Sequence, residues 1–215
     1  AQRALHSMRN IILLILPAFL LSWHLGMAQK PSKFSKSEKE FVGTGTADDP
    51  MRVYLITNPE DSVLLRTPSK PVKVNAKDKE LKLFVDRMYR TVRDSASMGV
   101  GIAAPQVGVL RQIIWVQRFD KKNFPFEVYL NPVIKQYTKK QQCGPEGCLS
   151  VPERTDSVFR AYAILLEYDK MDGSHEIEMI EGFTAVIFQH EIDHLNGIIY
   201  LDHLVAERRE ALQKP

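Results

Sequence analysis

The sequence has little of several features that mark special classes of protein. Its 215 residues include only two cysteines, which excludes a fold held together by several disulfides. Its 29 basic and 26 acidic residues give a formal charge of +3, so no broad basic surface for nucleic acid is expected. We find no internal repeat. With 44% hydrophobic and 26% charged residues, the composition is that of an ordinary globular protein, and the length suits one domain.

Long hydrophobic runs are also absent. The run from Ile11 to Trp23 is almost entirely apolar but spans only 13 residues, whereas a membrane-spanning helix needs about 20. Arg9 precedes it, and the stretch Gly26-Met27-Ala28 supplies the small residues of a cleavage site. This pattern predicts a cleaved export signal, with an uncleaved anchor and a buried helix as alternatives.

The chain divides into three segments. Residues 1–28 are an N-terminal extension and signal-like segment, in which the expected initiator is Met8. Residues 29–50 are polar, rich in Lys, Ser and Gly, and show no apolar period, which predicts a flexible tether. Residues 51–215 are expected to form a single domain.

Hydrophobic periodicity predicts the elements of that domain. Residues 78–93 show an apolar stripe at helical spacing, and residues 183–195 show a second one that ends at Asn196-Gly197, a helix stop signal. A final helix is expected over residues 203–214. Strands are predicted where β-branched and aromatic residues gather, over residues 112–118, 126–134, 162–168 and 175–182. The order predicts an α+β fold with the second helix packed on an antiparallel sheet.

The stretch QHEIDHLNG, residues 189–197, contains the pattern H-E-x-x-H. His190 and His194 lie four residues apart, so on a helix both imidazoles face the same side. Glu191 then lies beside them, which is the arrangement by which many zinc hydrolases bind a metal and activate water. The alternative is a pair of structural histidines satisfied by their neighbours.

A catalytic metal needs a third protein ligand and an open position. The extended motif of one class of zinc protease would place a histidine at position 200, where Tyr200 stands. The other protease option is a downstream glutamate, but Glu207 and Glu210 lie in a charged terminal helix that we expect to be solvated. Neither option favours a protease.

Cys148 is a stronger candidate for the third ligand. It lies in the stretch GPEGCLSVP, residues 144–152, which we expect to be a loop. A Cys-His-His set suits ferrous iron, zinc, nickel or cobalt. The competing interpretation is a disulfide with Cys143, which would consume the ligand.

A third stretch, GVGIAAPQVG at residues 99–108, is rich in glycine. Glycines allow a backbone to approach a ligand or another chain closely. It is not a phosphate-binding fingerprint, and taken alone a tight structural turn explains it as well as a site does.

Together, GVGIAAPQVG, EGCLS and QHEIDHLNG resemble, in this order, the three signature motifs of the peptide deformylase family. The resemblance extends from about Val53 to Leu204. It implies antiparallel β-sheets packed around a central helix that carries H-E-x-x-H. It also implies the family's reaction, in which the formyl group of N-formylmethionyl peptides or nascent chains is released as formate.

Carried over residue by residue, the resemblance implies that Cys148, His190 and His194 bind one divalent metal ion, with water in the fourth position. Fe²⁺ is the expected metal, and Zn²⁺, Ni²⁺ or Co²⁺ could substitute. Glu191 would act as general base and then as general acid.

The resemblance also implies roles around the metal. The Gln106 amide and the Leu149 backbone N–H would donate to the oxyanion. Gly101 would let the substrate lie alongside as an added strand. Apart from the resemblance, we hypothesise that Glu146, paired with Arg160, orients a metal ligand without binding the ion itself. The wall for the methionine side chain would be formed by Val100, Val186 and Ile187.

The signal-like segment departs from a family that acts on nascent chains in the cytoplasm. We therefore expect a bacterial protein that is exported to the periplasm or tethered to the membrane through this segment alone, with a cytoplasmic location as the alternative. It is expected to be a monomer without a nucleic-acid partner. N-terminal sequencing distinguishes a cleaved export signal from an uncleaved segment, because a start at Gln29 supports export and a start near Met8 argues against cleavage.

Two other functions remain open at this point. A zinc endopeptidase would cleave internal peptide bonds and would not depend on Cys148. A non-catalytic module that binds formyl peptides would be indifferent to the loss of Glu191.

Overall fold

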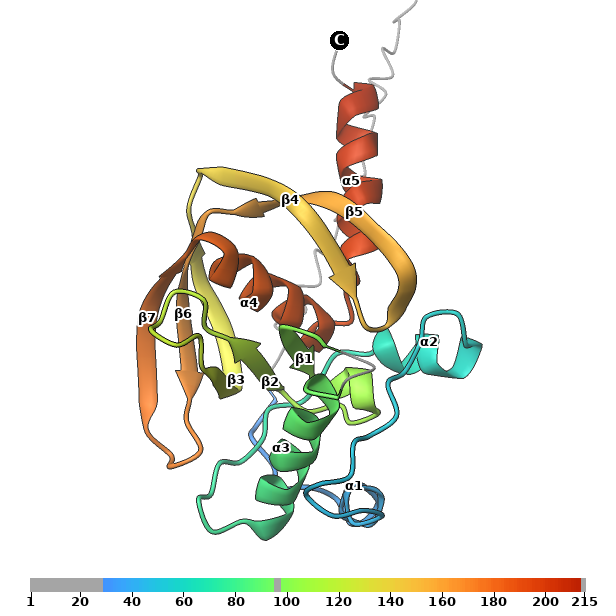
Figure 1. Cartoon of the computed structure of the whole chain (residues 1–215), viewed down its shortest axis with the longest axis vertical. Helices are drawn as coiled ribbons and strands as arrows, with labels where there is room; N and C mark the ends of the chain where they lie inside the picture. The colour runs from blue at the N-terminus through green and yellow to red at the C-terminus, as the bar shows by residue number, and fades with distance from the viewer. Residues whose placement is uncertain (1–28, 95–97, 214–215) are drawn as a thin grey trace, which may run out of the picture.

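The computed structural model describes residues 29–94 and 98–213 (Figure 1). In chain order the elements are α1 (Lys36–Val42), α2 (Pro59–Leu65), α3 (Lys79–Val92), β1 (Gly101–Ala103), a 3₁₀ turn (Ala104–Val107), β2 (Ile113–Gln117), β3 (Phe126–Tyr137), β4 (Gln141–Cys148), β5 (Val151–Ala161), β6 (Ala163–Asp169), β7 (His175–Glu181), α4 (Gly182–Leu195) and α5 (Tyr200–Gln213).

The strands form two separate antiparallel units. Five of them make one sheet in the order β1-β2-β3-β6-β7, while β4 and β5 pair only with each other. α4 lies between the sheet and the β4–β5 hairpin, so it contacts strands of both (Figure 1). The expected α+β class with a central helix is confirmed, and the consecutive strands β6 and β7 form a hairpin.

α4 is buried over most of its circumference because it is packed on two sides. Ala185, Phe188 and Leu195 belong to the core that it shares with the sheet, where the Phe188 ring meets Tyr129 edge to face at 4.7 Å.

The helix α4 ends where the sequence predicts. Gly197 adopts a φ of 73°, and a Cβ at that position would lie 2.4 Å from the Arg66 carbonyl oxygen, so only glycine fits there.

The expected loop around Cys148 is wrong. Residues 141–148 form β4, and Cys148 is its last residue, paired with Val151 across the tight turn to β5. The stretch contains two glycines and a proline and no β-branched residue, so its local propensity opposes a strand. The pairing of β4 with β5 therefore stabilises the strand, because the local β-propensity of these residues does not.

The expected flexible tether over residues 29–50 is also wrong. α1 begins with a capping box in which Ser35 and Glu38 each accept the other's backbone N–H, and Phe34 and Val42 are buried in the core beside α3. The carboxylate of Glu38 accepts two hydrogen bonds from the buried Arg111, both at 2.7 Å. The contacts with α3 and Arg111 join distant residues, whereas the S-x-x-E capping box is a local pattern that sequence reasoning missed.

The signal-like segment lies outside the described residues. Among the residues that are described, no helix is both long enough and apolar enough to cross a bilayer.

Replacing Glu38 tests the packing of this N-terminal segment. Burial raises the pKa of Glu38, but the hydrogen bonds from Arg111 outweigh it and lower the pKa to about 2. A lowered pKa in the folded state stabilises the protein above pH 4.5, and this contribution is lost as the pH falls towards 2. Glu38→Gln should therefore lower the free energy of unfolding by about 1–2 kcal/mol at pH 7 and by less at pH 3.5, measured by urea titration.

The matched control is Glu40→Gln in the same helix. Glu40 is exposed and lies 3.8 Å from Lys36, so its loss should change stability by about 0.5 kcal/mol or less. Equal effects of the two substitutions would contradict the packing of this segment.

Candidate functional site

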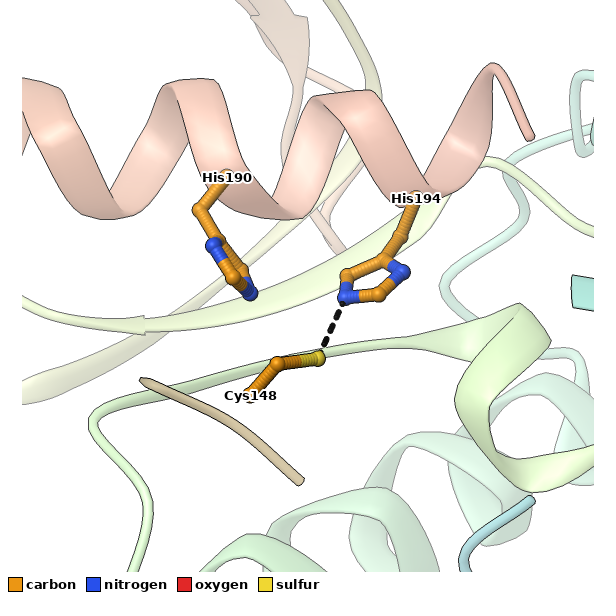
Figure 2. A group of neighbouring side chains, drawn as sticks. All are labelled: Cys148, His190 and His194. Atoms are coloured by element: carbon orange, nitrogen blue, oxygen red, sulfur yellow. Dashed lines mark hydrogen bonds between the residues drawn. The ribbon is translucent and has the colours of Figure 1, made fainter. Parts of the chain in front are cut away.

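Three side chains from two elements converge beneath the β4–β5 hairpin. His190 and His194 project from one face of α4 towards Cys148 at the end of β4 (Figure 2). Cys148 Sγ lies 3.1 Å from His194 Nε2, and the three ligand atoms all lie within 4.8 Å of one another. Among the described residues this is the one group of three or more such side chains placed to share an ion.

The chemistry of these side chains fits a divalent metal ion. Burial raises the pKa of the Cys148 thiol, but the charge of His194 and the hydrogen bonds from both histidines outweigh it and hold the pKa well below its ordinary value. A thiolate and two imidazoles are the soft and borderline ligands that bind zinc or ferrous iron, and their spacing suits bonds of about 2.0–2.3 Å. Three ligands leave one position for water or substrate.

Glu146 fixes the orientation of His190. Its Oε2 lies 2.8 Å from His190 Nδ1 and accepts that proton, so Nε2 is the nitrogen that faces the metal position. Arg160 holds the same carboxylate with two N–H groups, at 2.7 and 3.0 Å. Burial raises the pKa of Glu146, but these hydrogen bonds and charges lower it to about 2, so the group is an anion.

Glu191 lies beside the ligands without being one of them. Its carboxyl group is buried, and Oε2 has no hydrogen-bond partner within the described part of the chain. Burial raises its pKa to about 7, against the opposing charges of His190 and His194. A carboxyl group in this state can both accept and release a proton near neutral pH.

Gln106 reaches the site from the 3₁₀ turn after β1. Its Oε1 accepts the Ala103 N–H at 2.9 Å, which fixes the amide orientation. Its Nε2 donates to Ser150 Oγ at 3.2 Å and lies 3.6 Å from Cys148 Sγ. Leu149 directly follows Cys148 and lines the same cavity.

The site opens into a cavity of about 580 Å³ between β1, the β4–β5 hairpin and α4. Gly101 and the three apolar residues expected to receive a methionine side chain, Val100, Val186 and Ile187, all line it. Sequence reasoning missed Met98 and Phe183, which are exposed at the same cavity. Phe183 could have been found, because it lies seven residues before His190 and therefore on the same face of the helix.

The features that would support a protease are placed elsewhere. The Tyr200 ring stacks on His190 at a centroid distance of 6.1 Å, and its hydroxyl donates to the Arg154 carbonyl oxygen. The carboxylate of Glu207 accepts the Phe159 N–H. Neither side chain joins the group around His190 and His194.

Both cysteines are free, and Cys143 is exposed. They lie five residues apart on β4, which places their Cα atoms about 16 Å from each other at the ordinary rise of a strand. A disulfide requires Cα atoms within about 7 Å, so it could form only if β4 came apart.

Comparisons with known proteins agree with this geometry. The sequence model of the family described as "Polypeptide deformylase" matches residues 53–210. A peptide deformylase of Rhizorhabdus wittichii is 36% identical over 170 residues, which cover 76% of this chain and 93% of that protein. One of Pseudomonas aeruginosa is 35% identical over 150 residues, covering 70% and 86%.

Solved structures match as well. The class I type b peptide deformylase of Acinetobacter baumannii with bound Met-Ala-Ser superposes with a TM-score of 0.64 at 32% identity, covering 73% of this chain and 99% of that one. Its complex with actinonin gives a TM-score of 0.63 at 33% identity, covering 72% and 98%.

The two cysteines provide a matched test of the metal centre. Cys148→Ser should lower the affinity for Zn²⁺ by more than about 100-fold, because it removes a thiolate ligand. Cys143→Ser should leave the affinity unchanged, because that side chain is exposed on β4 and is not part of the ligand group. Competition with a chromogenic chelator measures both, and equal affinities of the two variants would contradict Cys148 as a ligand.

Proposed function

We propose that this chain, which belongs to the peptide deformylase family, hydrolyses the formamide of N-formylmethionyl peptides and releases formate and a free amine. The observation that carries the proposal is the convergence of Cys148, His190 and His194 with the buried Glu191 in one cavity. No observation favours an endopeptidase or a non-catalytic binding module.

The proposed ligands are Cys148, His190 and His194, and the proposed ion is Fe²⁺, for which Zn²⁺, Ni²⁺ or Co²⁺ could substitute. When bound, the ion would act as a Lewis acid that makes water acidic near neutral pH and polarises the formyl oxygen. The protein fixes the ligand atoms beforehand through the Glu146 carboxylate on His190.

Glu191 would transfer the proton. As a carboxylate it accepts a proton from the attacking water, and as a carboxylic acid it delivers that proton to the leaving amine nitrogen when the C–N bond breaks. Its position against Gly101 supports this role, since a Cβ built on Gly101 would lie 2.4 Å from Glu191 Oε1. The carboxyl group is thus held at the edge strand where a substrate backbone would lie.

Two donors would stabilise the charge that develops on the formyl oxygen. Gln106 Nε2 lies next to Cys148 Sγ, and its amide is already oriented by the Ala103 N–H. The Leu149 backbone N–H, one residue after Cys148, would be the second donor. Such a donor typically contributes about 10²–10³ in rate.

The substrate backbone would pair with β1. This strand is at the end of the five-stranded sheet, so among the described residues one of its edges pairs with no other strand and could accept an extended peptide. The methionine side chain would then contact Val100, Val186 and Ile187 along the cavity wall. The binding of Met-Ala-Ser to the relative from A. baumannii supports a peptide substrate.

The direct test is formate release from formyl-Met-Ala-Ser by the nickel- or iron-loaded protein. Glu191→Gln should lower kcat by about 10²–10⁴ through the loss of proton transfer, at an unchanged content of bound metal. The absence of formate from the reduced, metal-loaded wild type would overturn the proposal. Full activity of Glu191→Gln would remove Glu191 from the mechanism.

A second test uses two glycines. In Gly101→Ala the added methyl group should displace the Glu191 carboxyl and press on Ile187, lowering kcat/KM by about 100-fold. Gly144→Ala is the control, since its Cβ would meet nothing within 4 Å and its activity should stay near that of the wild type. Similar activities of the two variants would contradict the close approach at Gly101.

A further inference from the structure

A continuous series of hydrogen bonds leads from His190 away from the cavity to the C-terminal helix α5. Beyond Glu146, Arg160 directs Nε and Nη2 to the carboxylate that holds His190, while its Nη1 donates to Asp193 Oδ2 at 2.5 Å. The same Oδ2 lies 2.7 Å from His203 Nε2. His203 belongs to α5, so the series joins α4, the β4–β5 hairpin and α5.

The shortest contacts assign the protons in this series. The guanidinium of Arg160 can only donate, and the Asp193 carboxylate can only accept. The 2.7 Å contact therefore assigns the Nε2 proton of His203 to its hydrogen bond with Asp193. Asp193 Oδ2 thus accepts from both Arg160 Nη1 and His203 Nε2, and these two nitrogens lie 3.1 Å from each other.

The geometry of Arg160 connects the two ends. Its guanidinium is planar and rigid, so a contact that fixes Nη1 also fixes the plane in which Nε and Nη2 meet Glu146. Arg160 and Glu146 are buried, with 5% and 6% of their surfaces exposed, so no solvent replaces a lost partner cheaply. A shift of Asp193 would therefore move the Arg160 guanidinium and, with it, the Glu146 carboxylate that orients His190.

His203 is the outermost member of this series. Its side chain is one-third exposed, and with Arg160 and Asp193 it lines a second cavity of about 310 Å³. That cavity shares no lining residue with the catalytic one. His203 therefore lies away from the catalytic cavity and the metal ligands, and it would act through Asp193 and through Arg160, whose Nη1 lies 3.1 Å from His203 Nε2.

We propose that His203 is a positioning residue for the metal centre. It acts through Asp193, Arg160 and Glu146 to keep the His190 imidazole in the orientation that binds the metal. The inference rests on the proposed metal site and extends it to α5. The hydrogen bond from His203 keeps Asp193 against Arg160, and this slows release of the bound ion.

The chain contains a matched control. His175 and Asp169 form another His–Asp pair at 2.7 Å, on β7 and β6, but His175 is exposed and neither residue contacts the series described above. Replacing His175 removes a similar His–Asp hydrogen bond that is not connected to the metal ligands.

The experiment measures release of Zn²⁺ from the loaded full-length protein into an excess of chelator. His203→Ala should release the ion about 10-fold faster or more, which is the usual effect of removing a group that supports a ligand. His203→Gln should recover most of the difference, because its amide N–H can donate to Asp193. His175→Ala should match the wild type.

A second variant separates positioning from a general loss of stability. Asp193→Ala should also speed release, and combining it with His203→Ala should add little, because both substitutions remove the same hydrogen bond between the two side chains. Additive effects, or a wild-type release rate in the folded His203→Ala protein, would overturn the proposal. Equal acceleration by His203→Ala and His203→Gln would also overturn it. Release of zinc is measured without substrate, so this outcome is independent of whether formate is produced.

Discussion

The hydrogen bond between Glu146 and His190 is the interaction on which the rest of the site depends. It joins the β4–β5 hairpin to α4 inside the protein, and it leaves the other imidazole nitrogen free for a metal. A buried carboxylate is costly unless it is paired, and Arg160 from β5 supplies the pairing. The contact therefore fixes the hairpin over α4 and brings Cys148 to the histidines.

The side of α4 that faces the sheet contributes to the apolar core. There Phe188 packs against Tyr129 of the sheet, and the guanidinium of Arg118 lies 5.7 Å from the Phe188 ring. One helix thus presents apolar residues to the sheet and ionisable residues to the hairpin. This division explains why a helix with so little exposed surface carries two metal ligands and a catalytic carboxyl group.

The sequence predicts well what short-range patterns determine. α3 and α4 follow from apolar spacing and stop signals, and three motifs identify the family and the candidate ligands. The loop expected over residues 144–152 and the tether expected over residues 29–50 were wrong because pairing partners, not local propensity, stabilise these segments: β4 pairs with β5, and α1 is held by Arg111. The contact between Asp193 and His203 has no sequence signal at all, since it depends on how the turn after α4 places the start of α5.

The central claim is that a cysteine of the hairpin and two histidines of α4 hold one metal ion. X-ray absorption spectroscopy of the zinc-loaded protein tests it most directly. We expect one sulfur ligand at about 2.3 Å and two imidazole nitrogens at about 2.0–2.1 Å. A spectrum with imidazole and oxygen ligands but no sulfur would contradict the assignment of Cys148 and favour a centre of the zinc-protease type.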